Sequence, residues 1–320
     1  MTYAQGGLIT AGDYNTLVGA NTSVTGTDLN SAWAWGANSR GWGQSVVSLA
    51  SVNSADLITA TQWASLVNTL NSANTHINGS SSGLTANTAG QIIGYSGSLQ
   101  TKINGVNTDR LLFNSNSAVV VGSALAYAAW TSTTTTSTLT RAFGARATFT
   151  GGADKARFFF NAGGRMKFNI TATTTGGAGS RGAAALAVVD NLGGVALFAA
   201  NTNGGRTGTG GTAGTNDTAL GYYTSVFNAN TSIVATTSTT TNYTSDTGTI
   251  AVKPNGSQGS FGSNGDSIDF WATINSTSGG NSGGSFDDSL SLTPTVSIDI
   301  SYPEVTNISN TWGAITVTQL

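Results

Sequence analysis

The sequence predicts a mainly β protein in which a small N-terminal α-helical domain is followed by an antiparallel β-sandwich or jelly-roll domain. Three observations lead to this prediction. Apolar residues recur with helical spacing in the first 80 residues, they alternate with polar residues after residue 108, and glycine-rich turns separate the alternating segments. We expect the helical domain over 1–80, a Gly/Ser/Asn-rich linker or glycine-interrupted helix over 81–107, and the β-sandwich over 108–320.

A short internal repeat marks two helix starts. The segment LITAGDYNTLV, which begins at Leu8, recurs as LITATQWASLV, which begins at Leu57. In each copy the threonine is expected at the N-cap, and the residue three positions later, Asp13 or Gln62, completes a capping box. The second helix continues as an apolar stripe with helical spacing until Gly79 ends it.

Five aromatic residues in this region have two interpretations. One is an assembly or docking surface, because tryptophan faces stack on sugar rings and cations. The other, which we favour, is the core of a small helical domain that needs large side chains to fill it. The residues are Tyr14, Trp33, Trp35, Trp42 and Trp63.

From Arg110 onward the hydrophobic period becomes two, which is typical of strands with one buried and one solvated face. The pattern is strongest in three segments. Their alternating residues are Met166, Phe168 and Ile170; Ile268, Phe270, Ala272 and Ile274; and Val296, Ile298, Ile300 and Tyr302.

Two glycine pairs are expected to form tight hairpins, because glycine adopts the positive φ angles that such turns require. Gly163-Gly164 would join a strand at 158–160 to the next strand, and Gly193-Gly194 would join strands at 185–189 and 195–200. Many short strands separated by glycine-rich turns favour the sandwich.

The composition excludes most enzyme classes. The chain has one histidine (His76), one glutamate (Glu304) and no cysteine, with only 12 basic and 14 acidic residues. Acid–base catalysis and metal binding need titratable pairs or ligand clusters. We therefore expect no catalysis, no metal and no other cofactor, and we expect His76 to make an ordinary contact with the dipole of its helix.

The charge and hydropathy also exclude some partners. The net charge of −2 argues against binding to nucleic acid or to an anionic membrane. No segment approaches the roughly 18 consecutive apolar residues of a membrane span, so we expect no membrane insertion. The first 15 residues have neither a basic region nor an apolar run, so we expect no secretory signal.

Four aspartates are candidates for a glycosidase pair or a Ca²⁺ site: Asp266, Asp269, Asp287 and Asp288. Adjacent aspartates on a strand point to opposite faces, and no closing glutamate follows, so turn residues are the favoured interpretation. The glycine-rich segment 203–216 lacks the Gly-Lys-Ser/Thr ending of a phosphate loop and is expected to be a surface loop.

Charge is unevenly placed along the chain. Six of the 12 basic residues lie within 141–167, and eight of the 14 acidic residues lie within 217–304. Either these are solvated strand faces, or basic and acidic faces of neighbouring subunits meet in a cyclic oligomer. The proposed subunit interface consists of Arg141, Arg146, Arg157, Arg165, Asp287 and Asp288. Uncharged, β-prone threonine tracts at 131–140 and 236–244 also indicate a homo-oligomer, because they invite edge pairing.

Two sequence blocks resemble a known family. The first combines ITAxxYN near the start, GWGQ at 41–44 and ITATQW at 58–63, and the second is ARFFFNAGGRM at 156–166. The blocks resemble the N-terminal region and an FFNxGG hairpin of virion structural proteins from tailed bacteriophages, notably cyanophages and other marine phages. The resemblance implies a tail- or fibre-associated particle component, without catalytic residues to carry over.

We therefore expect a non-enzymatic bacteriophage virion structural protein, assembled in the host cytoplasm, that forms part of the tail, neck, baseplate or fibre. Its helical domain would dock on other phage virion proteins by analogy with phage fibres. Its sandwich would project as a homo-oligomer, with a trimer favoured, and contact with a host cell-surface glycan is a further role.

Three alternatives stay open. A capsid decoration protein would differ in its position on the particle. A polysaccharide depolymerase would take its carboxylates from the four aspartates above. A carbohydrate- or receptor-binding module would use aromatic residues beside loops. Its candidate contacts are Tyr222, Tyr223, Tyr243 and Trp271.

Overall fold

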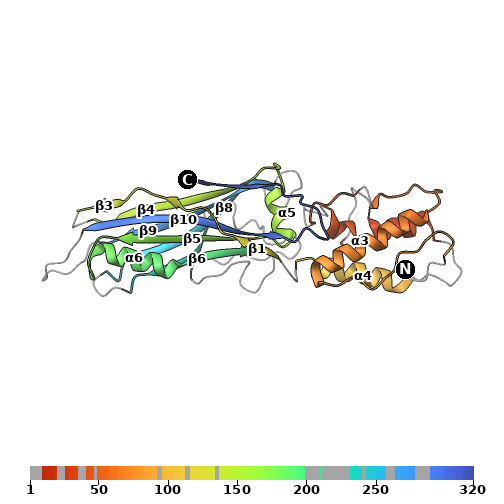
Figure 1. The fold of residues 1–320 in the computed structure, drawn as a ribbon, viewed down its shortest axis with the longest axis horizontal. Coiled ribbons are helices and arrows are strands. Elements are labelled where there is room, and N and C mark those ends of the chain that lie inside the picture. The colour runs from red at the N-terminus through yellow and green to blue at the C-terminus, as the bar shows by residue number, and fades with distance from the viewer. Residues whose placement is uncertain are drawn as a thin grey trace.

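The computed structural model describes residues 9–19, 26–34, 41–46, 49–91, 96–111, 116–133, 137–198, 210, 231–239, 243–256, 264–277 and 289–320. The molecule is elongated. Helices gather at one end, and two antiparallel β-sheets extend from them to the other end (Figure 1). The predicted mainly β class, with helices near the N-terminus, is confirmed.

The helices of the described residues fall into two groups. Four form the helical end: α1 (Ala11–Val18), α2 (Asn30–Trp33), α3 (Ala60–Asn78) and α4 (Ser96–Asp109). Two more lie among the strands: α5 (Lys155–Asn161) and α6 (Arg181–Leu192).

In the described part of the chain, six strands form one sheet and five form the other. The six-stranded sheet has the order β1-β10-β5-β6, with β2 and β3 also paired to β10, and the five-stranded sheet has the order β11-β4-β9-β8-β7. The strands are β1 (Asn116–Val120), β2 (Leu125–Ala126), β3 (Trp130–Ser132), β4 (Leu139–Phe149), β5 (Arg165–Thr174), β6 (Gly194–Phe198), β7 (Thr231–Thr237), β8 (Thr247–Gly256), β9 (Asn264–Ser276), β10 (Leu290–Pro303) and β11 (Ile315–Gln319).

Alternation correctly identified the three longest patterned strands. In β5, β9 and β10 the predicted apolar positions are buried, apart from the half-buried Tyr302, and the residues between them mostly face outward. The rings of Phe168 on β5 and Phe270 on β9 stack with their centres 5.4 Å apart, which joins the two sheets through one core. Burial of this apolar surface is the main stabilising term.

The first predicted glycine hairpin is wrong. Residues 158–160 lie in α5 rather than in a strand, and Gly163 (φ +101°) and Gly164 lead from that helix into β5. A Cβ on Gly164 would lie 2.5 Å from the ring of Phe159, so glycine is needed there for close packing. Three consecutive phenylalanines carry no periodicity, and such a run does not distinguish a strand from a helix.

The second predicted hairpin is also wrong, because residues 185–189 lie in α6. Ser180 caps this helix by accepting a hydrogen bond from the amide of Ala183 (3.1 Å), and Gly193 (φ +61°) ends it. Val188 and Leu192 pack against Gly248 on β8, so α6 fills space beside the sheets.

The described residues of the threonine tracts lie partly in strands. In the tract at 131–140, residues 131–132 end β3 and residues 139–140 begin β4. In the tract at 236–244, residues 236–237 end β7. Among the described strands, β7 and β11 form the edges of the five-stranded sheet.

The repeated motif forms both predicted helix starts. Asp13 donates its amide to the Thr10 hydroxyl (3.2 Å), and its carboxylate accepts the Thr10 amide (2.9 Å). Thr59 and Gln62 form the same capping box, with distances of 3.2 and 2.8 Å. The hydroxyl of Tyr14 donates to the Gln62 carbonyl (3.4 Å), so the two copies lie side by side.

The second half of the predicted linker is a helix. α4 runs through the expected boundary at residue 107 and buries Leu99, Ile103 and Val106 beside α3. The side chain of Asn107 donates to the carbonyl of Asp28 (2.7 Å), which ties α4 to the segment before α2. A division of the chain at residue 107 would therefore cut a packed helix.

The turn at residues 41–44, which we call the junction turn, joins the helical end to the sheets. Trp42 is wholly buried. Its indole donates to the carbonyl of Arg110 (3.1 Å), and its carbonyl accepts from the hydroxyl of Thr311 (2.8 Å). The C-terminal segment and the end of α4 therefore meet at one residue, the first through its backbone carbonyl and the second through its indole.

Two further contacts fix the junction turn. Gln44 accepts the amide of Ser309 (2.8 Å) and donates to the same residue's carbonyl (2.9 Å), across 265 positions of sequence. Gly43 has a φ of +71°, and a Cβ there would overlap the ring of Phe158 from α5. Glycine is required at this position by both conformation and space.

The last turn of α3 contacts the end of α5 through His76. Its Nε2 donates to the carbonyl of Ala162 (2.9 Å), and its ring meets that of Trp42 edge-on with centres 5.1 Å apart. Burial lowers the pKa of His76 to about 4, against the weaker opposite effects of the Ala162 carbonyl and Glu304. The ring is neutral near pH 7, so the expected contact with the helix dipole is not made by a charged imidazole.

A buried polar cluster closes the opposite end of the sheets. Arg181, at the start of α6, donates to the hydroxyl of Ser276 (3.0 Å) and to the carbonyl of Ser137 (2.6 Å). The carboxylate of Asp246 accepts from the Ser276 hydroxyl (3.1 Å) and from the amide of Thr277 (2.6 Å). Burial raises the pKa of Asp246, although these bonds and Arg181 oppose it. Four separate segments are held together here.

Substitution of Gly43 tests the junction turn. Gly43→Ala combines an unfavourable φ with overlap on Phe158, so we expect the free energy of unfolding to fall by about 3 kcal/mol. The measurement is urea denaturation followed by circular dichroism. Gly105→Ala is the matched control, because Gly105 lies inside α4 with open space beside it and the change should stabilise by roughly 0.5–1 kcal/mol. Equal effects of the two substitutions would contradict the role of the turn.

The lowered pKa of His76 predicts acid sensitivity. The native state resists protonation until about pH 4, whereas the unfolded chain takes up the proton near the ordinary value of 6.5. The contribution of neutral His76 to the free energy of unfolding is therefore fully present above pH 6.5 and decreases as the pH falls. By pH 5 the free energy of unfolding is lower by about 2 kcal/mol. Denaturation of the wild type and of His76→Gln at pH 7.5 and 5 measures this, and the variant should lose much less on acidification. The same pH dependence in both proteins would exclude His76 as its source.

Candidate functional site

Most of the aromatic residues predicted for docking lie inside the protein. Tyr14, Trp42 and Trp63 are at most 2% exposed and belong to the hydrophobic core, so they build the core rather than a surface that a partner touches. Trp33 is half-buried, and its indole nitrogen donates to a backbone carbonyl (3.1 Å). Trp35 lies outside the described residues.

A hollow lies between the two copies of the repeat at the helical end. Its volume is about 620 Å³. It is lined by residues 9–12 and Asn15 from the first copy, by Leu57 and Ile58 from the second, and by residues 54–56 just before the second. Leu57 is 89% exposed, more than any other large hydrophobic side chain in the described ranges. Ala55 has a φ of +80°, an unfavourable conformation for alanine.

The hollow is distant from the sheets. Residues 54–58 of its lining come directly before α3, and the last turn of α3 contacts the sheet end of the molecule through His76. At 1.5 Å per residue, the start of α3 lies roughly 25 Å from that contact. Figure 1 shows the same arrangement, with the helices extending away from the sheets. Of the described residues that line the hollow, Asp56 is the single charged one.

The residues predicted for a charged subunit interface do not form one surface. Arg157 is wholly buried, and Arg141 is half-buried with its guanidinium 5.5 Å from the centre of an aromatic ring. Arg146 and Arg165 lie on the outer faces of different sheets. Outside the described residues lie Asp287 and Asp288.

The outer face of the five-stranded sheet carries a tryptophan among small and polar residues. Trp271 on β9 stands in register between Gly144 on β4 and Ala251 on β8. Its six-membered ring occupies the place that a Cβ on Gly144 would need, with Cε3 at 2.5 Å. The indole is half-buried and has no bulky neighbour in either adjacent strand. We call the outward surface of β4, β9 and β8 the Trp271 face.

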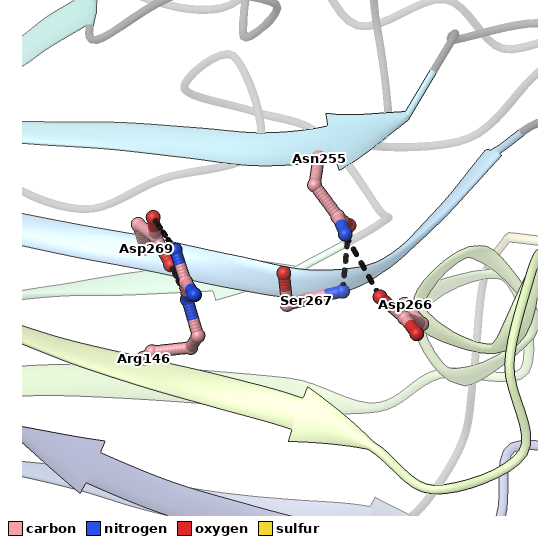
Figure 2. Close-up of polar contacts among 5 residues, drawn as sticks. All are labelled: Arg146, Asn255, Asp266, Ser267 and Asp269. Carbon is pink, nitrogen blue, oxygen red and sulfur yellow. Dashed lines mark hydrogen bonds and ion pairs between the residues drawn. The ribbon is translucent and has the colours of Figure 1, made fainter.

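Polar rows cross the Trp271 face on both sides of the indole. In one row, the Thr140 hydroxyl donates to the amide oxygen of Asn275 (2.7 Å), which in turn donates to the Thr247 hydroxyl (3.1 Å). In the row on the other side, Arg146 forms two hydrogen bonds of 2.6 and 2.7 Å with the carboxylate of Asp269 (Figure 2).

Figure 2 shows a second polar group beside this ion pair. The side chain of Asn255 donates to the carboxylate of Asp266 and accepts from the amide of Ser267, both at 2.8 Å. The Arg146 side chain stays 44% exposed, whereas that of Asp269 is 13% exposed. Hydrogen bonding to Asp269 raises the pKa of the Arg146 guanidinium. Both aspartates are thus committed to structural contacts.

The other predicted sites receive little support from the described residues. Tyr243 is 1% exposed, so it is a core residue and not a glycan contact. In the described ranges, no three His, Cys, Asp or Glu side chains are grouped so that they could hold a metal ion. None of the described helices has the length and hydropathy needed to cross a membrane. Tyr222, Tyr223 and, apart from Gly210, the segment 203–216 lie outside the described residues.

No family model matches the chain, and no curated protein or solved structure is detectably similar to it. The resemblance to phage virion proteins therefore rests on the sequence blocks, and the function has to be argued from the surfaces of the molecule.

The sequence patterns did not identify two residues of these surfaces, Gly144 and Leu57. Gly144 interrupts a strand pattern, and a strand glycine signals close approach of another group, so its contact with an aromatic ring could have been anticipated. Leu57 gave no such signal, because a leucine at the start of an apolar motif resembles a core residue.

The Arg146 ion pair is expected to contribute little to stability. Because Arg146 is substantially exposed, Arg146→Ala should lower the free energy of unfolding by less than about 1 kcal/mol. Arg181→Ala removes a buried guanidinium with several hydrogen bonds and should cost about 3 kcal/mol or more. Urea denaturation of both variants measures the contrast. A large loss in Arg146→Ala would show that this pair is structural rather than available to a ligand.

Proposed function

We propose that this chain is a non-enzymatic structural protein of a tailed-bacteriophage virion, a homo-oligomeric component of the tail, neck, baseplate or fibre. The proposal is supported by the two sequence blocks and by a composition poor in catalytic groups. An elongated form with two different ends also suits a protein that attaches at one end and projects at the other (Figure 1). Its partners would be other virion proteins, met in the host cytoplasm during assembly.

We infer that the two sheets form a β-sandwich. β1, β2 and β3 pair with β10, and β4 pairs with β9. Strands from the start of the β region therefore pair with strands from its end, as in Greek-key sandwiches and jelly rolls. Among the described strands, β7 and β11 are the edges of the five-stranded sheet, and an oligomer protects such edges from unwanted pairing. A homotrimer is the favoured state.

The hollow at the helical end is the observation that carries the docking role. An exposed leucine side chain is about 1.5–3 kcal/mol less favourable than a buried one. Ala55, two residues away, adds backbone strain through its positive φ. A partner that covers Leu57 would recover the burial. Because Asp56 is the charged residue of the lining, the complementary surface would present an aliphatic side chain next to a basic group.

A capsid decoration protein is the second candidate, because the same hollow could attach the chain to a capsid. Position on the particle separates the two, and labelling of intact virions with an antibody against the chain, viewed by electron microscopy, would show whether the tail or the capsid is decorated.

Leu57 provides the test of docking. We expect Leu57→Ser to lower incorporation into particles at least tenfold, since about 1.5 kcal/mol or more of interface burial is lost. Tagged chains would be supplied in cells infected with the phage that encodes the protein, and purified particles would be quantified by immunoblot. Val119→Ser is the control, because Val119 is also exposed (58%) but lies on β1.

Equal incorporation of the two variants would reject docking through the hollow, and absence of the wild-type chain from particles would reject the virion assignment. Light scattering of the purified full-length variants, which should share one native mass, separates docking from self-assembly. A monomeric wild type would reject the trimer.

A further inference from the structure

The Trp271 face has an arrangement of groups that the virion role does not require. We infer that it is a carbohydrate-binding surface on which one pyranose ring of a neutral polysaccharide stacks on the indole of Trp271 while its hydroxyls bond to the polar side chains that flank the indole. The inference goes beyond the structural role and does not depend on the position of the chain on a particle.

The packing of Trp271 suits stacking on a sugar. The indole covers Gly144 on one side, and Ala251 lies on its other side. Neither of these two register partners has a side chain large enough to block a flat ligand. Adjacent strands are about 4.8 Å apart, so β4, β9 and β8 together span roughly 10 Å, enough for a pyranose ring. Contact with β4 also fixes the indole in place, so little side-chain entropy is lost on binding.

Polar side chains flank the indole at distances that suit hydrogen bonds to a sugar. Outward residues on one strand are about 7 Å apart, so Thr273 and Asp269 stand on either side of the indole, and the row through Asn275 lies one outward position beyond Thr273. Asp269 holds the guanidinium of Arg146 in a fixed orientation, and this side chain remains 44% exposed. A guanidinium has five N–H donors, more than the two bonds to Asp269 use, so it can also donate to a sugar hydroxyl.

The charges and backbone of this face favour a neutral sugar over other ligands. Arg146 is paired with Asp269 and also feels the charge of Asp266, and Lys253 stands in register with Asp269 on β8. The basic groups of this face therefore lie beside carboxylates, so no strong field attracts an anion. The backbone groups of β9 are used in ladders with β4 and β8, so a peptide cannot add as a strand here. An interface with a folded protein would need more apolar area than one indole offers.

Isothermal titration calorimetry on the full-length protein tests the inference. The probes are hexasaccharides of glucose, mannose, galactose and N-acetylglucosamine, with hexagalacturonate as the anionic comparison. We expect at least one neutral hexasaccharide to bind, Trp271→Ala to weaken that binding at least tenfold, and Trp271→Phe to retain it within about threefold, because phenylalanine keeps an aromatic face. Arg146→Ala should weaken it severalfold.

Two further variants keep the result interpretable. Ala251→Glu leaves Trp271 in place and puts a long side chain beside it, so it should abolish binding even if Trp271→Ala is poorly folded. Thr171→Ala, on the outer face of the other sheet, should bind as the wild type does. Circular dichroism and urea denaturation establish that each variant is folded.

Three results would overturn the inference. They are no binding to any neutral hexasaccharide, binding that Trp271→Ala and Ala251→Glu leave unchanged, and binding of hexagalacturonate alone with loss at high salt. In the second case Trp271 would serve only to cover Gly144, and its replacement would lower stability without affecting binding. None of these outcomes bears on incorporation into particles, which the Leu57 variants test separately.

Discussion

Burial of Trp42 between the helical end and the sheets is the interaction on which the rest of the structure depends. The end of α4 and the last turn of α3 contact its indole, and the C-terminal segment donates a hydrogen bond to its backbone carbonyl. Because one continuous core runs through both ends of the molecule, the helical part is not an independent appendage. Any arrangement in which the helices attach to a partner therefore also fixes the direction in which the sheets project.

Scarcity of charge shapes both the interior and the surface. With few ions available, the sheets use hydroxyl and amide side chains on their outer faces, as in the chain from Thr140 to Thr247. Several of the arginines are buried, and one of them, Arg181, joins segments that no strand ladder connects. The charges of Arg181 and Asp246 therefore hold connecting segments against the end of the sheets.

The local elements were largely predictable, and the surfaces were not. Alternation identified β5, β9 and β10, and the threonine caps placed α1 and α3, because both signals depend on neighbours in sequence. α5 and α6 were mistaken for strands because the apolar runs that they contain have no clear period. The burial of Arg157 and the pairing of Arg146 with Asp269 depend on segments far apart in sequence, so no local pattern could reveal them.

The long strands run along the long axis of the molecule (Figure 1). β5 pairs with β10 over ten successive residues, and β4 pairs with β9 over another ten. A pull between the helical end and the far end would load these hydrogen bonds together in shear, rather than one at a time as in unzipping. The junction turn passes that load into the core through side chains. The protein is therefore built to bear tension along its length, and weaker when pulled apart sideways.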